Sequence, residues 1–239
     1  MSPAETKLFV AKIRILHMSA FSGTLLSLAY LGLHSALTNP TYFTSIVTGL
    51  NPTVEGDHLN EVAEIVRDLH SDQGKKGVQA AVIVFMHAGM ESALTDTVEA
   101  FFEARPHKFY KFITDKKITI SELLNLGKDE IIKTKIKEFL SDLERRPVLK
   151  KTSTLFTLLE NSYSSEKYSF DGERLARIDS LRHQCAHGGA DVADFSNFDD
   201  DLAYLRETAD FFIDAASAAL DIKLPQADIK VEQSAAANL

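Results

Sequence analysis

The chain has 239 residues, 45% of them hydrophobic, and carries a formal net charge of −8 at pH 7. The apolar content is ample for a large buried core, and the negative charge argues against a protein that binds polyanions through its net charge alone. The single cysteine excludes an internal disulfide framework and suits a reducing cytoplasm. Only 6 Pro and 11 Gly interrupt the helical periodicity, which predicts an all-α fold.

The first predicted helix begins near Pro3 and ends at Leu37, before the stop signal Thr38-Asn39-Pro40. Its second half, Met18 to Leu37, has no charged side chain and is long enough to span a membrane. Several Ser, Thr and His side chains make this half only marginally apolar, so we favour a core or interface helix and expect no membrane association. A signal peptide is not indicated, because the apolar run is interrupted and no small-residue cleavage site follows it.

A loop over residues 41–56 leads to a helix from Asp57 that ends before Ser71, and a second loop over 74–77 lacks the pattern of a phosphate-binding loop. The next helix, Val78 to Ala104, is apolar nearly all round, which places it at the centre of the bundle. His87 and Glu91 are its only early polar groups. They either form a satisfied pair in the core, which is the simpler interpretation, or line an active cleft.

The middle of the chain is basic, with 13 Lys and Arg against 7 Asp and Glu between residues 104 and 151. This region could contact phosphates, but Lys and Glu alternate at helical spacing, as on a solvated helix face. The aromatic run 109–113 could stack on bases, although a turn that faces the core is the simpler role. The candidate RNA contacts are Lys108, Lys111, Lys116 and Lys117.

Further helices are predicted over residues 121–126, 129–146, 147–160, 173–187 and 202–220. Five Asp residues between 191 and 201 suggest Mg²⁺, but a capped loop before the last helix explains them better. We divide the chain into an N-terminal helical segment packed on the bundle, 1–73, a helical domain, 74–222, and a disordered tail, 223–239.

The predicted helix over 173–187 concentrates the polar chemistry of the chain. Asp171 can cap its start, and Gly188-Gly189 can adopt the left-handed conformation that closes it. An apolar arc faces the core, and Arg182 lies at the edge of that arc. Asp179, His183 and His187 follow one another at intervals of four residues, so they lie on one face. The apolar arc consists of Leu175, Ile178, Leu181 and Cys185.

Arg182, the polar His183, three intervening residues and His187-Gly188 resemble the R-x4-6-H motif of HEPN domains, an all-α family with many RNA-cleaving members. The stretch 80–102, with His87, Met90-Glu91 and Leu94, looks like the long upstream helix of the RiboL-PSP branch. The resemblance covers roughly residues 77–220. It implies a HEPN-type up-and-down helical bundle, here with an additional N-terminal helix, and a homodimer in which two motifs face one cleft.

The chemistry that this resemblance implies is metal-independent RNA cleavage to 2′,3′-cyclic phosphate and 5′-OH ends. His187 would transfer a proton to or from the reacting oxygens, and Arg182 would stabilise charge on the phosphate. His183 would position the phosphate or share the proton transfer, and Asp179, Glu91 and His87 would support the site. No metal or cofactor is expected.

Bacterial members of the family often act as toxins or phage-defence effectors. The partners implied by this resemblance are therefore an RNA substrate, a second copy of the chain, and an antitoxin or regulatory protein.

Three other interpretations stay open. Arg182 and the histidines could simply stabilise a helix C-terminus through its dipole. They could bind Zn²⁺ with Asp179, although Cys185 points about 200° away from His183 on the helical wheel. The third alternative is a HEPN module that binds RNA, a nucleotide or a partner without cutting.

Overall fold

The computed structural model describes residues 1–27, 72–112, 127–160 and 168–225, and all elements within these ranges are helical. This confirms the all-α class. The elements are α1 (Pro3–Ser27), α5 (Asp72–Ala104), the 3-10 helix η2 (Pro106–Phe112), α7 (Lys128–Glu144), α8 (Val148–Leu159), α9 (Gly172–Ala186) and α10 (Phe198–Leu220).

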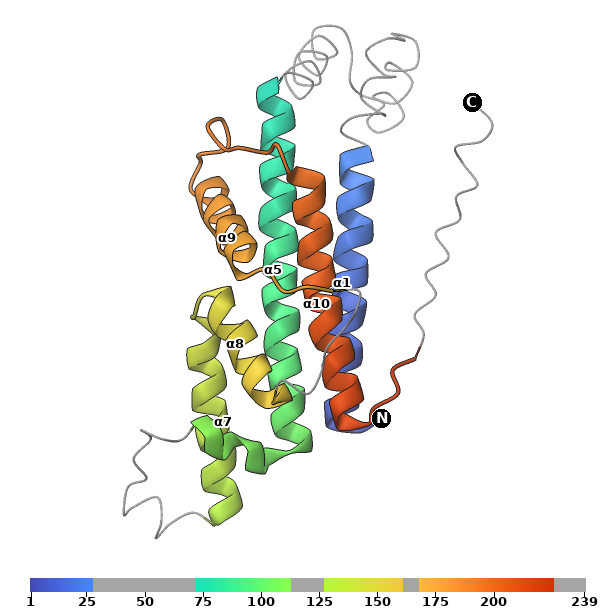
Figure 1. The fold of residues 1–239 in the computed structure, drawn as a ribbon, viewed down its shortest axis with the longest axis vertical. Coiled ribbons are helices and arrows are strands. Elements are labelled where there is room, and N and C mark those ends of the chain that lie inside the picture. Colours follow the sequence, from blue (N-terminus) through green and yellow to red (C-terminus); the bar gives the residue numbers. More distant parts are fainter. Residues whose placement is uncertain (28–71, 113–126, 161–167, 226–239) are drawn as a thin grey trace, which may run out of the picture.

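The long helix α5 is the centre of the molecule, as its nearly uniform apolar sequence predicts. Helices α1 and α10 run alongside it, while α9 lies beside its first half and α8 beside its second half (Figure 1). The 3-10 helix η2 and α7 pack near its C-terminal end. Every other described helix therefore contacts α5, which positions α9 against the central helix along the turns that carry His87 and Glu91.

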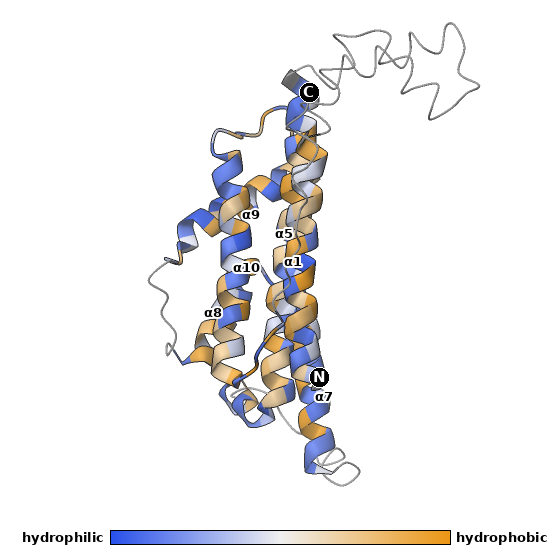
Figure 2. Ribbon diagram, turned by 90° about the vertical axis from the view of Figure 1, so that its right-hand side faces the viewer, coloured by the Kyte–Doolittle hydropathy of each residue, from blue (hydrophilic) through white to orange (hydrophobic). Residues whose placement is uncertain are grey.

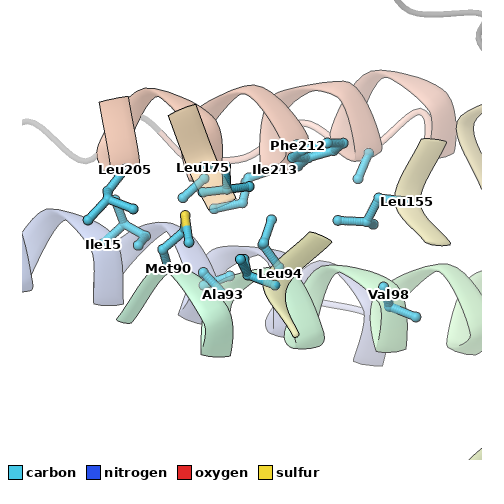
Figure 3. Close-up of a cluster of buried hydrophobic side chains, with 14 of the residues drawn as sticks. Ile15, Met90, Ala93, Leu94, Val98, Leu155, Leu175, Leu205, Phe212 and Ile213 are labelled. Atoms are coloured by element: carbon cyan, nitrogen blue, oxygen red, sulfur yellow. The ribbon is translucent and has the colours of Figure 1, made fainter. Parts of the chain in front are cut away.

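One continuous hydrophobic core joins these helices, and α1 contributes to it together with the rest. Figure 3 shows Met90 and Leu94 of α5 facing side chains of α10, with Leu155 of α8 and Leu175 of α9 closing the cluster. Most of the helices are amphipathic, with apolar and polar residues interspersed along them, so that an apolar side can face the neighbouring helices (Figure 2). Full burial of each large apolar side chain contributes about 1.5–3 kcal/mol, which makes this cluster the main source of stability.

Two helix starts differ from the predictions. Helix α5 begins at Asp72, so residues 74–77, predicted as a loop, are helical. Its first turns are tied to the rest of the protein by Lys76, whose Nζ donates to the backbone oxygen of Asp191 at 2.8 Å. Helix extension adds one backbone hydrogen bond per residue, which offsets the roughly 1 kcal/mol cost of each glycine.

Helix α10 begins at Phe198, four residues before the predicted Leu202, so the run Asp199-Asp200-Asp201 forms its first turn instead of ending a loop. Carboxylates are stabilised at this position by the positive end of the helix dipole. The acidic run therefore begins the helix and was wrongly predicted to precede it.

The bounds of α7, α8 and α9 agree with the predictions to within two residues at each end. Several predicted segments lie outside the described residues: the end of the first helix, the loop 41–56, the helix from Asp57, the short helix 121–126 and the tail from 226.

Among the described helices, only α5 is long and apolar enough, over Gln73–Ala104, to cross a membrane by length and composition. Half of its most apolar window is buried inside the bundle, and the core helix of a soluble protein passes the same test. The candidate span considered from the sequence, Met18 to Leu37, falls within the described residues only as far as Ser27.

Candidate functional site

The two ends of α9 are built as the sequence predicts. The carboxylate of Asp171 accepts a hydrogen bond of 2.9 Å from the backbone N–H of Arg174, which caps the helix start. The hydroxyl of Tyr204 on α10 also bonds both the backbone N–H and the carbonyl of Asp171, at 2.8 Å each. At the other end, Gly188 has a φ of 84°, the left-handed conformation that glycine favours. These contacts set the position of α9 on the bundle.

The apolar face of α9 points into the core. Leu175, Ile178 and Leu181 are buried, whereas Cys185 is only partly covered. Desolvation raises the pKa of the Cys185 thiol, which disfavours the thiolate needed for metal binding or nucleophilic attack. The arc is therefore mainly a packing surface, and Arg182 lies at its margin.

Arg182 forms an ion pair with Asp179 on the preceding turn of α9, with Nη2 donating to Oδ1 at 2.9 Å. The side chain of Arg182 keeps 29% of its surface exposed, while its Nε atom is buried. The same Oδ1 atom of Asp179 lies 3.2 Å from Nε2 of His87 on α5. Asp179 thus connects the motif arginine to a histidine that is fully buried.

The other ring nitrogen of His87 faces Glu91, with Nδ1 3.6 Å from Oε2. Glu91 also accepts a 3.0 Å hydrogen bond from Nζ of Lys151 on α8, a side chain that is only 4% exposed. Desolvation acts to raise the pKa of Glu91, but the adjacent His87 and the hydrogen bond and charge of Lys151 outweigh it and lower that pKa to about 2. Glu91 is therefore ionised at neutral pH.

These five side chains form a linear chain that crosses three helices, with a cation at each end and the imidazole of His87 between two carboxylates. We call it the ion chain, and it runs Lys151, Glu91, His87, Asp179, Arg182. With a neutral imidazole the two cations balance the two carboxylates, so its net charge is zero. Both ring nitrogens of His87 are buried and neither makes a hydrogen bond, although a carboxylate oxygen lies near each of them.

The structure bears on the first interpretation of His87 and Glu91 only in part, since the pair lies in the core but neither nitrogen of His87 is hydrogen-bonded. The pair is inside the bundle, as a core pair would be, and it also connects to Arg182 through Asp179. Lys151 was missed by the sequence analysis. A signal for it exists, since Lys151 follows Val148 by three residues and precedes Leu155 by four, which places a charged side chain on the buried stripe of α8.

His183 and His187 lie apart from this chain, on the solvent-exposed side of α9. Their ring centroids are 4.4 Å apart and the rings are inclined by 60°. This juxtaposition follows from their spacing of four residues. The site therefore has two parts, a half-buried arginine anchored from inside and an exposed histidine pair on the last turns of the same helix.

The candidate RNA contacts Lys108 and Lys111 are not brought to this site. Both bind Oε1 of Glu160, at 2.5 and 2.6 Å, where η2 meets the end of α8. These two hydrogen bonds lower the pKa of Glu160 to about 2. Lys116 and Lys117 lie outside the described residues. The aromatic turn faces the core, because Phe109 is buried and packs on Phe102 at a centroid distance of 5.4 Å.

The acidic run Asp199-Asp200-Asp201 at the start of α10 was considered above as a Mg²⁺ site, but Asp201 has arginine partners on α9. Asp201 is buried and binds two arginines of α9, Arg174 at 3.3 Å and Arg177 at a shorter distance. Arg174 also lies over the ring of Tyr204, 4.8 Å from its centroid. In the part of the chain that the structure describes, no group of three or more His, Cys, Asp or Glu side chains is arranged to hold a metal ion.

Comparison with known proteins adds no relative to this picture. No family model matches the chain, and neither a curated protein nor a solved structure matches it. The site is therefore interpreted from its own geometry and from the motif that its residues form.

Proposed function

We propose that this chain is a HEPN-type endoribonuclease that cleaves RNA without a metal ion, as a homodimer in the cytoplasm. The observation that carries the proposal is the arrangement of Arg182 on α9. Its guanidinium is held by Asp179, which is itself backed by the buried His87, and it lies next to a turn with two exposed histidines. An arginine fixed before substrate arrives stabilises a charged transition state without the cost of reorganising it.

Arg182 would bind the scissile phosphate. The guanidinium presents five N–H donors in a planar fork, and the Nη2 contact with Asp179 uses only part of this capacity. As the 2′-hydroxyl attacks phosphorus, negative charge builds on the non-bridging oxygens, where the positive fork is most effective. The partial exposure of the side chain is compatible with this contact.

The exposed histidines would transfer the protons. A base takes the proton of the 2′-hydroxyl while an acid protonates the departing 5′ oxygen, so that a 2′,3′-cyclic phosphate and a 5′-OH form. Imidazole suits both roles near neutral pH. We assign His187 to this transfer, with His183 positioning the phosphate or sharing the proton. A toxin or phage-defence role, with an antitoxin as partner, belongs to the same proposal.

A second candidate is a HEPN module that binds RNA, a nucleotide or a partner without cutting it. The contact that favours it is again at Arg182, whose Nη2 is engaged by Asp179 and whose Nε is buried. Arg182 and His187 are also five residues apart, which separates them by about 140° around the helix. Both features suit an anchoring arginine better than one that works directly with His187.

The test compares purified wild type with Arg182→Ala and His187→Ala on mixed RNA in EDTA, with Ser180→Ala as a control on the exposed side of α9. The nuclease proposal expects cyclic-phosphate ends from wild type and the control, and only a small residue of such cleavage from the two folded variants. If wild type leaves RNA intact, the binding module becomes the better proposal, and a gel-shift comparison of wild type with Arg182→Ala tests it.

A further inference from the structure

The pair His183 and His187 has a geometry that proton transfer alone does not require. Both imidazoles are exposed on one face of α9, and their centroids lie 4.4 Å apart. Within the described ranges the ring contact between them is the only interaction of either side chain, so no hydrogen bond or ion pair holds their nitrogens. Two neutral imidazoles side by side present two nitrogen lone pairs to solvent.

We propose that His183 and His187 form a bidentate site for a divalent transition-metal ion such as Zn²⁺ or Ni²⁺. Zinc binds imidazole nitrogen at about 2.0–2.1 Å with tetrahedral angles, so two such nitrogens lie about 3.3 Å apart. Each ring nitrogen is about 1 Å from the ring centre, so rings whose nitrogens converge on one tetrahedral metal ion have centroids about 5 Å apart. The observed separation of 4.4 Å is somewhat shorter, so side-chain rotations that move the two exposed rings slightly apart would bring their nitrogens onto one ion.

The surroundings of the pair also favour a cation. His183 lies in the last turn of α9 and His187 caps its C-terminus, where the helix dipole attracts positive charge. The charge of Arg182, the adjacent cation in sequence, is offset by its ion pair with Asp179. Since no third ligand converges on this point within the described residues, water or a bound molecule would complete the coordination shell. The site is therefore open and its metal exchangeable.

This site bears on the proposed nuclease, and that consequence rests on the proposed function. A metal ion on His187 takes the lone pair that would accept the 2′-hydroxyl proton, so the metal-loaded protein would not cleave RNA. The ion would act as a reversible inhibitor, removed by a chelator. Metal binding itself does not depend on catalysis and can be measured in the absence of RNA.

The experiment is isothermal calorimetry of the full, untagged, EDTA-stripped chain with ZnCl₂ and with NiCl₂. The variants are His183→Ala and His187→Ala, and the matched controls are His17→Ala and His107→Ala, which remove exposed histidines on α1 and η2. The substituted side chains are all exposed, so circular dichroism should show the same fold in each protein. Loss of one of two ligands should weaken binding by at least about tenfold.

The proposal expects this weakening in both α9 variants and in neither control. It is overturned if wild type shows no binding heat, or if either α9 variant binds within tenfold of wild type. A cleavage assay in the same buffers separates the two proposals. Cleavage that saturating Zn²⁺ stops and EDTA restores supports both, whereas metal binding by a chain that never cleaves RNA supports the metal site and contradicts the nuclease.

Discussion

Nε2 of His87 on α5 lies 3.2 Å from Oδ1 of Asp179 on α9, and this contact joins the centre of the bundle to the arginine of the motif. A buried imidazole is costly unless its nitrogens have partners. Two carboxylates lie beside the nitrogens of His87, although neither nitrogen makes a hydrogen bond, and each carboxylate has a cation on its far side. The position of Arg182 therefore depends on groups as distant in sequence as His87 and Lys151.

The first prediction concerns Asp179. Asp179→Ala removes the hydrogen-bond acceptor of Arg182 and the carboxylate beside the buried His87, and the free energy of unfolding should fall by about 1–3 kcal/mol. Urea denaturation measures this change. Asp179→Asn keeps an oxygen acceptor and should cost less. A fall in stability no greater than that of the exposed control Ser180→Ala would contradict the ion chain.

The same variant tests whether Asp179 positions Arg182 for cleavage. If Asp179 acts through Arg182, the double variant Asp179→Ala/Arg182→Ala should cleave RNA no more slowly than Arg182→Ala alone. A merely structural role would instead give effects on kcat/KM that multiply. The comparison of the four proteins is thus a double-mutant cycle on activity.

The second prediction concerns Lys151. Lys151→Met leaves the Glu91 carboxylate without its cation, and the free energy of unfolding should fall by about 3 kcal/mol. This value is at the low end for a broken buried ion pair, because Glu91 is 23% exposed. Adding Glu91→Gln removes the unpaired charge. The double variant should therefore recover much of the loss, with a coupling free energy of about 1–3 kcal/mol in denaturant unfolding. Strict additivity of the two changes would count against the pair.

The third prediction is a pH dependence carried by Glu91. Its pKa is lowered from 4.5 to about 2 in the folded protein, so its ionised form stabilises the fold above pH 4.5. As the pH falls from about 5 to about 2, this contribution, on the order of 3 kcal/mol, should disappear.

Glu91→Gln removes this titrating group and provides the control. Over the same acidic range, the free energy of unfolding of Glu91→Gln should fall less than that of wild type. Urea denaturation followed by circular dichroism at each pH measures both. Parallel stability curves for wild type and Glu91→Gln would show that Glu91 does not titrate with a lowered pKa.

The parts of the fold that the sequence predicted are those with local causes. The ends of α9 were predicted because Asp171 caps within three residues and Gly188 closes the last turn by its own φ. The predicted starts of α5 and α10 were wrong. The Gly/Lys run 74–77 and the Asp run 199–201 have the composition of loops, but both are helical because the helix gains a backbone hydrogen bond with each added residue.

The candidate site shows the same division. Arg182, His183 and His187 could be predicted from their spacing on one helix. The contact between His87 and Asp179 joins residues 92 positions apart (179 minus 87), and it depends on how α9 packs on α5. Lys151 was missed for the same reason, since no pattern within α8 says which carboxylate of another helix it will meet.

The last prediction concerns Asp201, which ties the motif helix to α10. Its side chain is 1% exposed and accepts hydrogen bonds from Arg174 and Arg177. Asp201→Ala should lower the free energy of unfolding by about 1.5–3 kcal/mol, the usual worth of hydrogen bonds to a charged group. The two arginines, 31% and 46% exposed, can then be hydrated, which limits the loss.

Asp200→Asn is the matched control, because Asp200 is exposed in the same first turn of α10 and its replacement should change stability by no more than about 0.5 kcal/mol. The Asp201 contacts hold the first half of α9, so hydrogen exchange should quicken more in α9 of Asp201→Ala than in α7, which Asp201 does not contact. Equal protection of α9 in Asp201→Ala and Asp200→Asn would mean that packing alone, through Leu175 and Ile178, holds the motif helix in place.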